Sequence, residues 1–220
     1  MVSWTGAGTG LSIGSRNSKG LEGFAYRMSI LEEKQMQKLH KEVIKLHDNI
    51  RKHSSEETAN TIAYGKHLPL HPTQHEKKEW VNFVAAGLES KFDEKSIREI
   101  RLGCYCNENG KLDQSKQFVA GVFARSNSLG DFIGKMNDQG VGWTLKDNVI
   151  FTYYDSCSCP MLEGVDHLER KTWCYCTLGF NQQIFENVLG VPIEAALLKS
   201  IKMGDDKCVM SIRPLEDPFD

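Results

Sequence analysis

The spacing of the hydrophobic residues changes near Gly140-Val141-Gly142, and this change limits the possible folds more than any other feature of the chain. Before it, apolar residues recur three and four positions apart, which is the period of an amphipathic helix. After it, short runs rich in β-branched and aromatic residues alternate with turn-forming residues, as in antiparallel strands. We therefore predict an α+β protein, with a helical N-terminal half followed by an antiparallel sheet and a packed helix.

The first predicted helix runs from Met28 to about Arg51 and has a stripe of Leu39, Val43, Leu46 and Ile50 along one side. The stripe has the character of a coiled-coil seam. Two hypotheses explain it: the helix packs on its own domain, or it forms the seam of a homodimer. The histidines on this helix are interpreted as solvated side chains.

Further helices are predicted from capping signals and apolar spacing. Predicted starts are the capping-box spacing at Ser54–Glu57, a second capping box at Thr73, and a capping Asp93. Two more helical stretches are expected near 114–125 and 128–138.

The sequence pattern of the second half predicts two hairpins and one helix. The first hairpin joins 143–145 to 149–154 through a turn at 146–148, and the second joins 191–201 to 207–212. Between them, residues 173–176 are predicted as a strand, and 178–189 as a helix whose apolar side is buried.

Length and composition fit one domain, since the chain has 220 residues of which 40% are hydrophobic. Residues 1–20 contain five glycines and four serines and are expected to form a flexible arm. The helical region, 21–140, and the sheet region, 141–220, are expected to form that single domain together.

Charge and hydropathy argue against nucleic acids and membranes as partners. The net charge is -2, without the clustered basic residues that nucleic-acid binding needs. No apolar run approaches the ~20 residues of a membrane span, and no secretory signal precedes the helices. We expect a cytoplasmic protein whose seven cysteines are thiols, metal ligands or redox groups.

Four of the seven cysteines form two closely spaced Cys-x-Cys pairs, Cys157/Cys159 and Cys174/Cys176. Residues two apart in a strand point to the same face, so each pair could direct both sulfurs into one space. Four thiolates suit a structural zinc ion, although zinc ribbons usually space their cysteines as Cys-x2-Cys. A redox or catalytic thiol, a disulfide and simple apolar packing are the alternatives.

Five other residues are possible additions to this site. Cys208 lies on the last predicted strand, and Cys104 and Cys106 form a third pair at a helix end. His167 lies in the connector between the two main pairs, and Glu186 lies on the helix that follows them. For Cys208, His167 and Glu186 the competing interpretations are a core residue, a solvated histidine and an exposed helix charge.

The last third of the chain resembles a known superfamily. The resemblance lies in Cys-Ser-Cys-Pro (157–160), Cys-Tyr-Cys-Thr-Leu-Gly-Phe (174–180) and the ending with Gly-Asp-Asp-x-Cys (204–208). It covers about 143–213. The superfamily includes vinyl-reductase-like small-molecule-binding domains and L-2-amino-thiazoline-4-carboxylic acid hydrolases. The resemblance implies an antiparallel sheet with helices against it, a pocket for a small ligand, and cysteines that bind a metal.

Two functional hypotheses follow. The first is a small-molecule-binding domain with a cysteine cluster that holds a metal, for which zinc is the candidate. The second is a hydrolase that opens a thiazoline-type or other C–N/C–S ring through an activated thiolate or a metal-bound water. A closed four-cysteine site would favour the first, and a Cys–His pair or an open metal position the second. A weaker third hypothesis is an interaction protein with purely structural cysteines.

Overall fold

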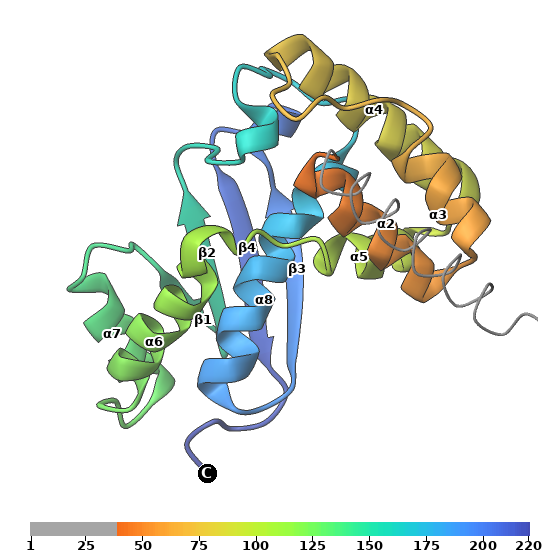
Figure 1. Ribbon diagram of the computed structural model, residues 1–220. Coiled ribbons are helices and arrows are strands. Elements are labelled where there is room, and N and C mark those ends of the chain that lie inside the picture. Colours follow the sequence, from red (N-terminus) through yellow and green to blue (C-terminus); the bar gives the residue numbers. More distant parts are fainter. Residues whose placement is uncertain (1–38) are drawn as a thin grey trace, which may run out of the picture. The chain divides into compact units, whose positions relative to one another are not determined.

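The computed structural model describes residues 39–220, which form a helical part followed by a four-stranded antiparallel sheet with a helix packed against it (Figure 1). The predicted α+β class is confirmed. The predicted arm at 1–20, and the part of the first predicted helix before Leu39, lie outside the described residues.

The elements of the described chain follow one another without a repeat. The helices of the first part are α2 (Lys41–His53), α3 (Glu56–Ala63), α4 (Gln74–Lys91), α5 (Glu94–Leu102), α6 (Lys111–Phe123) and α7 (Leu129–Asn137). The second part consists of β1 (Thr144–Lys146), β2 (Val149–Tyr154), α8 (Tyr175–Leu189), β3 (Ile193–Lys199) and β4 (Cys208–Pro214). Short 3-10 turns lie between them: η1 (Glu108–Gly110), η2 (Pro160–Leu162), η3 (Lys171–Cys174) and η4 (Ile201–Met203).

Local capping signals place most helix starts. Thr73 and Glu76 form the predicted capping box at the start of α4, and the Asp93 side chain accepts the Ser96 amide at the start of α5. Helix α3 is capped by Ser55, so it starts one residue later than a box beginning at Ser54 would place it. Side-chain oxygens accept hydrogen bonds from the first backbone amides, which have no partner inside the helix. These helix starts can therefore be predicted from the sequence.

The start of the first described helix differs from the prediction. Helix α2 begins at Lys41 rather than running through Leu39, because His40 has extended backbone and its Nδ1 accepts the Glu42 amide at 3.2 Å. The apolar stripe considered as a dimer seam lies in the chain's own core, where Val43, Leu46 and Ile50 are buried.

The environment of His47 differs from the prediction that the histidines on this helix are solvated. It is buried rather than solvated: its ring stacks on Tyr64, and its Nε2 lies 3.1 Å from both Glu56 Oε1 and Asn60 Oδ1. Its neighbours on α3 therefore take the place of water as hydrogen-bond partners.

The sheet has the strand order β1-β2-β4-β3, and every neighbouring pair is antiparallel. Both predicted hairpins are present. Asp147 and Asn148 have φ of 50° and 61°, the left-handed conformation of a two-residue turn that matches strand twist. In the β2/β4 register Tyr154 lies opposite Cys208, so the start of β4 is beside the segment that carries Cys157 and Cys159.

The strand predicted at 173–176 is wrong, because this segment is the 3-10 turn η3 running directly into α8. Tertiary packing explains the difference. The Trp173 ring meets Trp80 edge-on at a centroid distance of 5.5 Å, and the Arg101 guanidinium lies 3.9 Å from its centroid. Cys174 and Cys176 therefore do not share one face of a strand.

Two hydrophobic cores meet at the first turn of α8. Cys174 and Cys176 belong to the core built from α2–α5, whereas Tyr175 and Leu178 belong to the core between α6–α8 and the sheet. Figure 1 shows α8 lying across the sheet, with α6 beside it. The cysteines thus lie where the helical part and the sheet part are joined.

Candidate functional site

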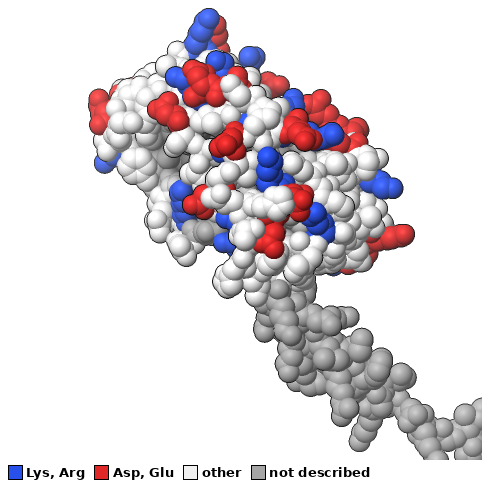
Figure 2. Space-filling view, turned by 90° about the horizontal axis from the view of Figure 1, so that it is seen from above, with Lys and Arg blue, Asp and Glu red and all other residues white. Residues whose placement is uncertain are grey.

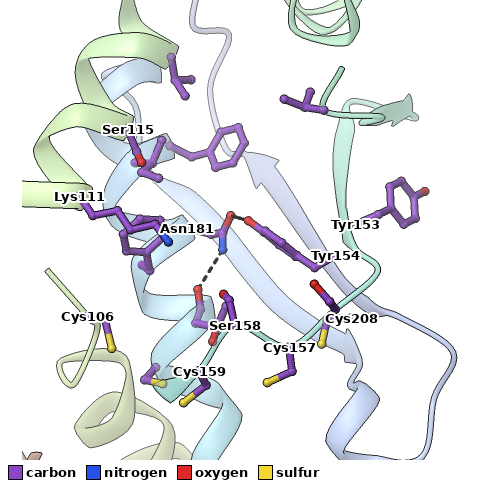
Figure 3. A pocket seen from close by; sticks show the side chains of 18 of the residues that line it. Cys106, Lys111, Ser115, Tyr153, Tyr154, Cys157, Ser158, Cys159, Asn181 and Cys208 are labelled. Atoms are coloured by element: carbon purple, nitrogen blue, oxygen red, sulfur yellow. Dashed lines mark hydrogen bonds between the residues drawn. The ribbon is translucent and has the colours of Figure 1, made fainter. Parts of the chain in front are cut away.

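A cavity of about 490 Å³ lies between α6, α8 and β2, with the segment after β2 at one end (Figure 3). Six aromatic side chains contribute to its walls, among them Trp143, Tyr154 and Phe180. A cavity of this size and lining is typical of a small-molecule site.

One wall carries neutral polar groups fixed by hydrogen bonds. Asn181 is 2% exposed, its Oδ1 accepts the Tyr154 hydroxyl at 2.8 Å, and its amide nitrogen donates to the Thr177 carbonyl at 2.9 Å. Burial raises the pKa of Tyr154, so the phenol stays protonated at neutral pH. These groups give the cavity a rigid polar wall without charge.

Lys111 supplies a positive charge to the cavity lining. It is the first residue of α6, and its side chain extends toward the side of the cavity that holds Asn181 (Figure 3). Within residues 39–220 no carboxylate forms an ion pair with its ammonium group. This charge is available to a negatively charged ligand.

Cysteine sulfurs lie at the other end of the cavity. Figure 3 shows Cys157, Cys159 and Cys208 grouped there and Cys106 on the α6 side; Cys176 also lines the cavity. A second cavity of about 20 Å³, large enough for about one water molecule, is lined by Cys157, Cys159, Cys174, Cys176 and Cys208. The four predicted metal ligands and Cys208 therefore surround one small space.

The donor geometry does not fit a preformed metal site. Among residues 39–220, no three His, Cys, Asp or Glu side chains are placed to hold one ion. The Cys174 sulfur lies 3.3 Å from the Ser200 hydroxyl, whereas the Cys176 thiol interacts with the free thiol of Cys159. The second pair therefore does not direct both sulfurs to one point. Zinc stays a prediction that elemental analysis of protein purified under reducing conditions would test.

Cys159 and Cys176 form a hydrogen-bonded pair of thiols. The bond from Cys159, opposed by burial and helped by the Arg101 charge, lowers the pKa of Cys176 to about 6. The same hydrogen bond and burial raise the pKa of Cys159. Cys176 is also the second residue of α8, where the helix dipole favours a thiolate. One proton is thus shared by two sulfurs at neutral pH.

Arg101 explains why a thiolate is tolerated in this buried position. The residue is 1% exposed, one nitrogen donates to the Trp173 carbonyl at 3.1 Å, and Nε and Nη1 have no hydrogen-bond partner within the described residues. Burial opposes its charge, but the neighbouring Cys104 and Cys176 sulfurs and Glu42 outweigh burial and raise its pKa. A buried cation needs a counter-charge, and the Cys176 thiolate supplies one.

Two other cysteines behave as buried thiols. Burial raises the pKa of Cys104 to about 11 and that of Cys174 to about 12. The Cys104 thiol donates to the Ile100 carbonyl at 3.3 Å. Neither lines the larger cavity, so both are packing residues by their position.

The raised pKa values of Cys104 and Cys174 predict that the protein loses stability at alkaline pH. Their pKa values are higher in the folded than in the unfolded chain, so their contribution is complete below the unfolded value near 9 and is lost as pH rises toward 11 and 12. Each group should lower the unfolding free energy by about 1.4 kcal/mol per pH unit in that window. Urea denaturation between pH 8 and 10.5 measures this. The double variant Cys104→Ala/Cys174→Ala should show a shallower dependence, and an equal slope would contradict the assignment.

The Gly-Asp-Asp-x-Cys motif has a structural role. Gly204 has a φ of 95°, the Asp205 carboxylate accepts the Ser200 amide at 2.8 Å, and the Cys208 sulfur accepts the Ile201 amide at 3.4 Å. These bonds hold the turn between β3 and β4 around η4. Burial raises the pKa of Cys208, which keeps it a thiol at neutral pH.

The remaining predicted residues divide between the cavity and the surface. Cys106 lines the cavity. His167 is exposed in the connector, and Glu186 is half-buried and accepts a hydrogen bond from Gln182 at 2.7 Å; neither lines the cavity. The geometry therefore provides neither as an acid or base for Cys176.

Sequence reasoning missed Arg101, Lys111, Tyr154 and Asn181. For two of them a signal was present: Arg101 lies four residues after Ile97 on the apolar side of its helix, and Asn181 lies four before Phe185. A polar residue on a buried helix face is a reason to expect a functional or paired group. Lys111 and Tyr154 carry no such signal.

Comparison with known proteins gives one match. Residues 33–219 match the model of a family described as a family of unknown function (DUF6144). No curated protein and no solved structure matches the chain significantly. No described helix is long and apolar enough to span a membrane, and on the face shown in Figure 2 acidic and basic side chains are interspersed.

Proposed function

Since the chain belongs to DUF6144, a family of unknown function, its role must be inferred from its own site, and we propose that it binds a small aromatic or apolar compound that carries a negative charge. The observation that carries this proposal is the cavity of about 490 Å³ with six aromatic side chains and Lys111 in its lining. We further propose a relationship to the vinyl-reductase-like superfamily, supported by the resemblance over 143–213.

The chemistry of the lining determines the proposed ligand class. Aromatic side chains such as Trp143 and Phe180 favour a flat apolar body that stacks against them. The Asn181 amide and the Tyr154 hydroxyl are engaged with each other and with Thr177, so they orient a ligand through their remaining hydrogen-bond capacity. The Lys111 ammonium favours a carboxylate or a similar anion.

A pair of matched probes tests this proposal. Isothermal titration calorimetry should show 2-naphthoate binding more tightly than the neutral 2-naphthamide. The variant Lys111→Met should weaken 2-naphthoate by about fivefold, the scale of one partly solvated charge contact, and leave 2-naphthamide unchanged. Lys116→Met is the control, because Lys116 is on the same helix but does not line the cavity. Equal affinity of both probes for the wild type would contradict an anionic ligand.

Hydrolysis of a thiazoline-type or similar ring is the second candidate. The Cys176 thiolate at the cavity supports it, since a thiolate is the nucleophile such a reaction needs. Against it, no histidine lines the cavity in the described part of the chain, and His167 is exposed elsewhere. Turnover of a thiazoline carboxylate by the wild type, lost in Cys176→Ser, would move this candidate to first place.

A further inference from the structure

We infer that Cys176 and Cys159 form a redox-active dithiol that reduces a small-molecule disulfide entering the cavity. The inference rests on the proposed function in one respect, namely that the disulfide reaches the sulfurs through the same cavity. Its basis is that both thiols line this cavity and also the smaller cavity of about 20 Å³, where each influences the pKa of the other.

The two cysteines come from segments of different secondary structure. Cys176 lies in the first turn of α8, packed between the two cores and 6% exposed. Cys159 lies in the irregular segment between β2 and η2 and is half-buried. A disulfide needs a sulfur–sulfur distance of about 2.05 Å, shorter than a hydrogen-bonded contact. The irregular segment can make that movement while the helix stays in place.

The residues around the two sulfurs indicate which one attacks the substrate and which one resolves the mixed disulfide. Arg101 and the start of α8 favour negative charge on Cys176, so Cys176 is the attacking thiolate. Cys159 keeps the proton and lies next to it, which is the position of a resolving thiol. Because Cys176 is almost fully buried apart from the cavity, only a small molecule can present a disulfide to it.

The reaction consists of two successive thiol–disulfide exchanges. The Cys176 thiolate attacks one sulfur of the substrate disulfide, a bond forms between Cys176 and that sulfur, and the other half leaves as a thiolate. Cys159 then gives its proton to the departing thiolate and attacks Cys176, which releases the second half as a thiolate. The protein has lost two electrons and gained one disulfide, and the substrate has become one thiol and one thiolate, which can take a proton from water.

An aromatic disulfide with carboxylates, 5,5′-dithiobis(2-nitrobenzoic acid), is a suitable probe because it also has the proposed ligand chemistry. In the wild type we expect mass spectrometry of limited reactions to show loss of two hydrogen atoms and a peptide cross-link between Cys159 and Cys176. In Cys159→Ser the reaction should stop with one thionitrobenzoate attached to Cys176. Cys176→Ser should form neither product, and Cys174→Ser, outside the larger cavity, should behave as the wild type.

Two results would overturn the dithiol. One is a wild type that stops at a mixed disulfide on Cys176, and the other is a cross-link that joins Cys159 to a different cysteine such as Cys157. Binding of 2-naphthoate by the same preparations separates the two proposals. Protein that binds 2-naphthoate but forms no Cys159–Cys176 bond keeps the proposed function and loses the dithiol, whereas protein that forms the bond but does not bind 2-naphthoate loses only the proposed ligand class.

Discussion

Replacing Gly179 by Ala is expected to lower the free energy of unfolding by roughly 2–3 kcal/mol, the upper part of the range for inserting a methyl group into a closely packed site. Gly179 lies in the second turn of α8, where that helix crosses the end of α5. A Cβ atom there would lie 2.1 Å from the Leu102 carbonyl oxygen and 2.9 Å from the Leu102 Cα. These are backbone atoms, so they can give way only if the two helices separate.

A matched control is available in α6. Gly121 is a helix-interior glycine with no atom within 4 Å of an added Cβ, so Gly121→Ala should raise stability by about 1 kcal/mol through helix propensity alone. Urea denaturation of both variants measures the two changes. A Gly179→Ala variant as stable as the wild type would contradict the close contact between α5 and α8.

Replacing Arg101 by Met is expected to slow alkylation of Cys176 by iodoacetamide by about tenfold at pH 5, which lies below the pKa of the thiol in both proteins. The hydrogen bond from Cys159, together with the smaller effect of the Arg101 charge, lowers the pKa of Cys176 to about 6, against the opposing effects of burial and the Glu42 charge. Without the cation the pKa should rise by at least about one unit, and each unit removes tenfold of the thiolate at a pH below the pKa.

The pH dependence gives the sign of the effect. In the wild type the thiolate predominates above about pH 6, so the alkylation rate should be near its plateau at pH 7.5 and fall as pH drops through 6. In Arg101→Met the whole profile should move to higher pH. Arg101→Lys retains a charge and should recover part of the rate, and Arg51→Met, an exposed arginine on α2, is the control.

Mass spectrometry of the peptide that contains Cys176 follows this one thiol among seven. Far-ultraviolet circular dichroism and a thermal melt establish that each variant is folded before rates are compared. A profile for Arg101→Met that coincides with the wild type in a folded protein would remove Arg101 from the account of Cys176. The shared proton with Cys159 would then be the remaining cause of the lowered pKa.

Elements governed by neighbouring residues could be predicted from the sequence. Thr73 and Asp93 mark helix starts because a side-chain oxygen satisfies amides within three residues. Asp147-Asn148 marks the first hairpin because both residues accept left-handed backbone. Two predictions of secondary structure were wrong for different reasons. His40 caps its own helix through a local bond to the Glu42 amide, whereas Trp173 packs against Trp80 and Arg101, which are distant in the sequence.

For the site, the sequence predicted the residue types and their spacing but not their arrangement in space. The sequence alone determined that the chain is a helical half followed by an antiparallel sheet, and that cysteines recur at one spacing near the end of a strand. Only the tertiary structure decided which sulfurs meet. The first turn of α8 brings Cys176 to Cys159 and Arg101, and the β2/β4 register brings Cys208 to the same end of the cavity. The physical reason is that secondary structure depends on bonds a few residues apart, whereas the charge on a buried thiol depends on neighbours from distant segments.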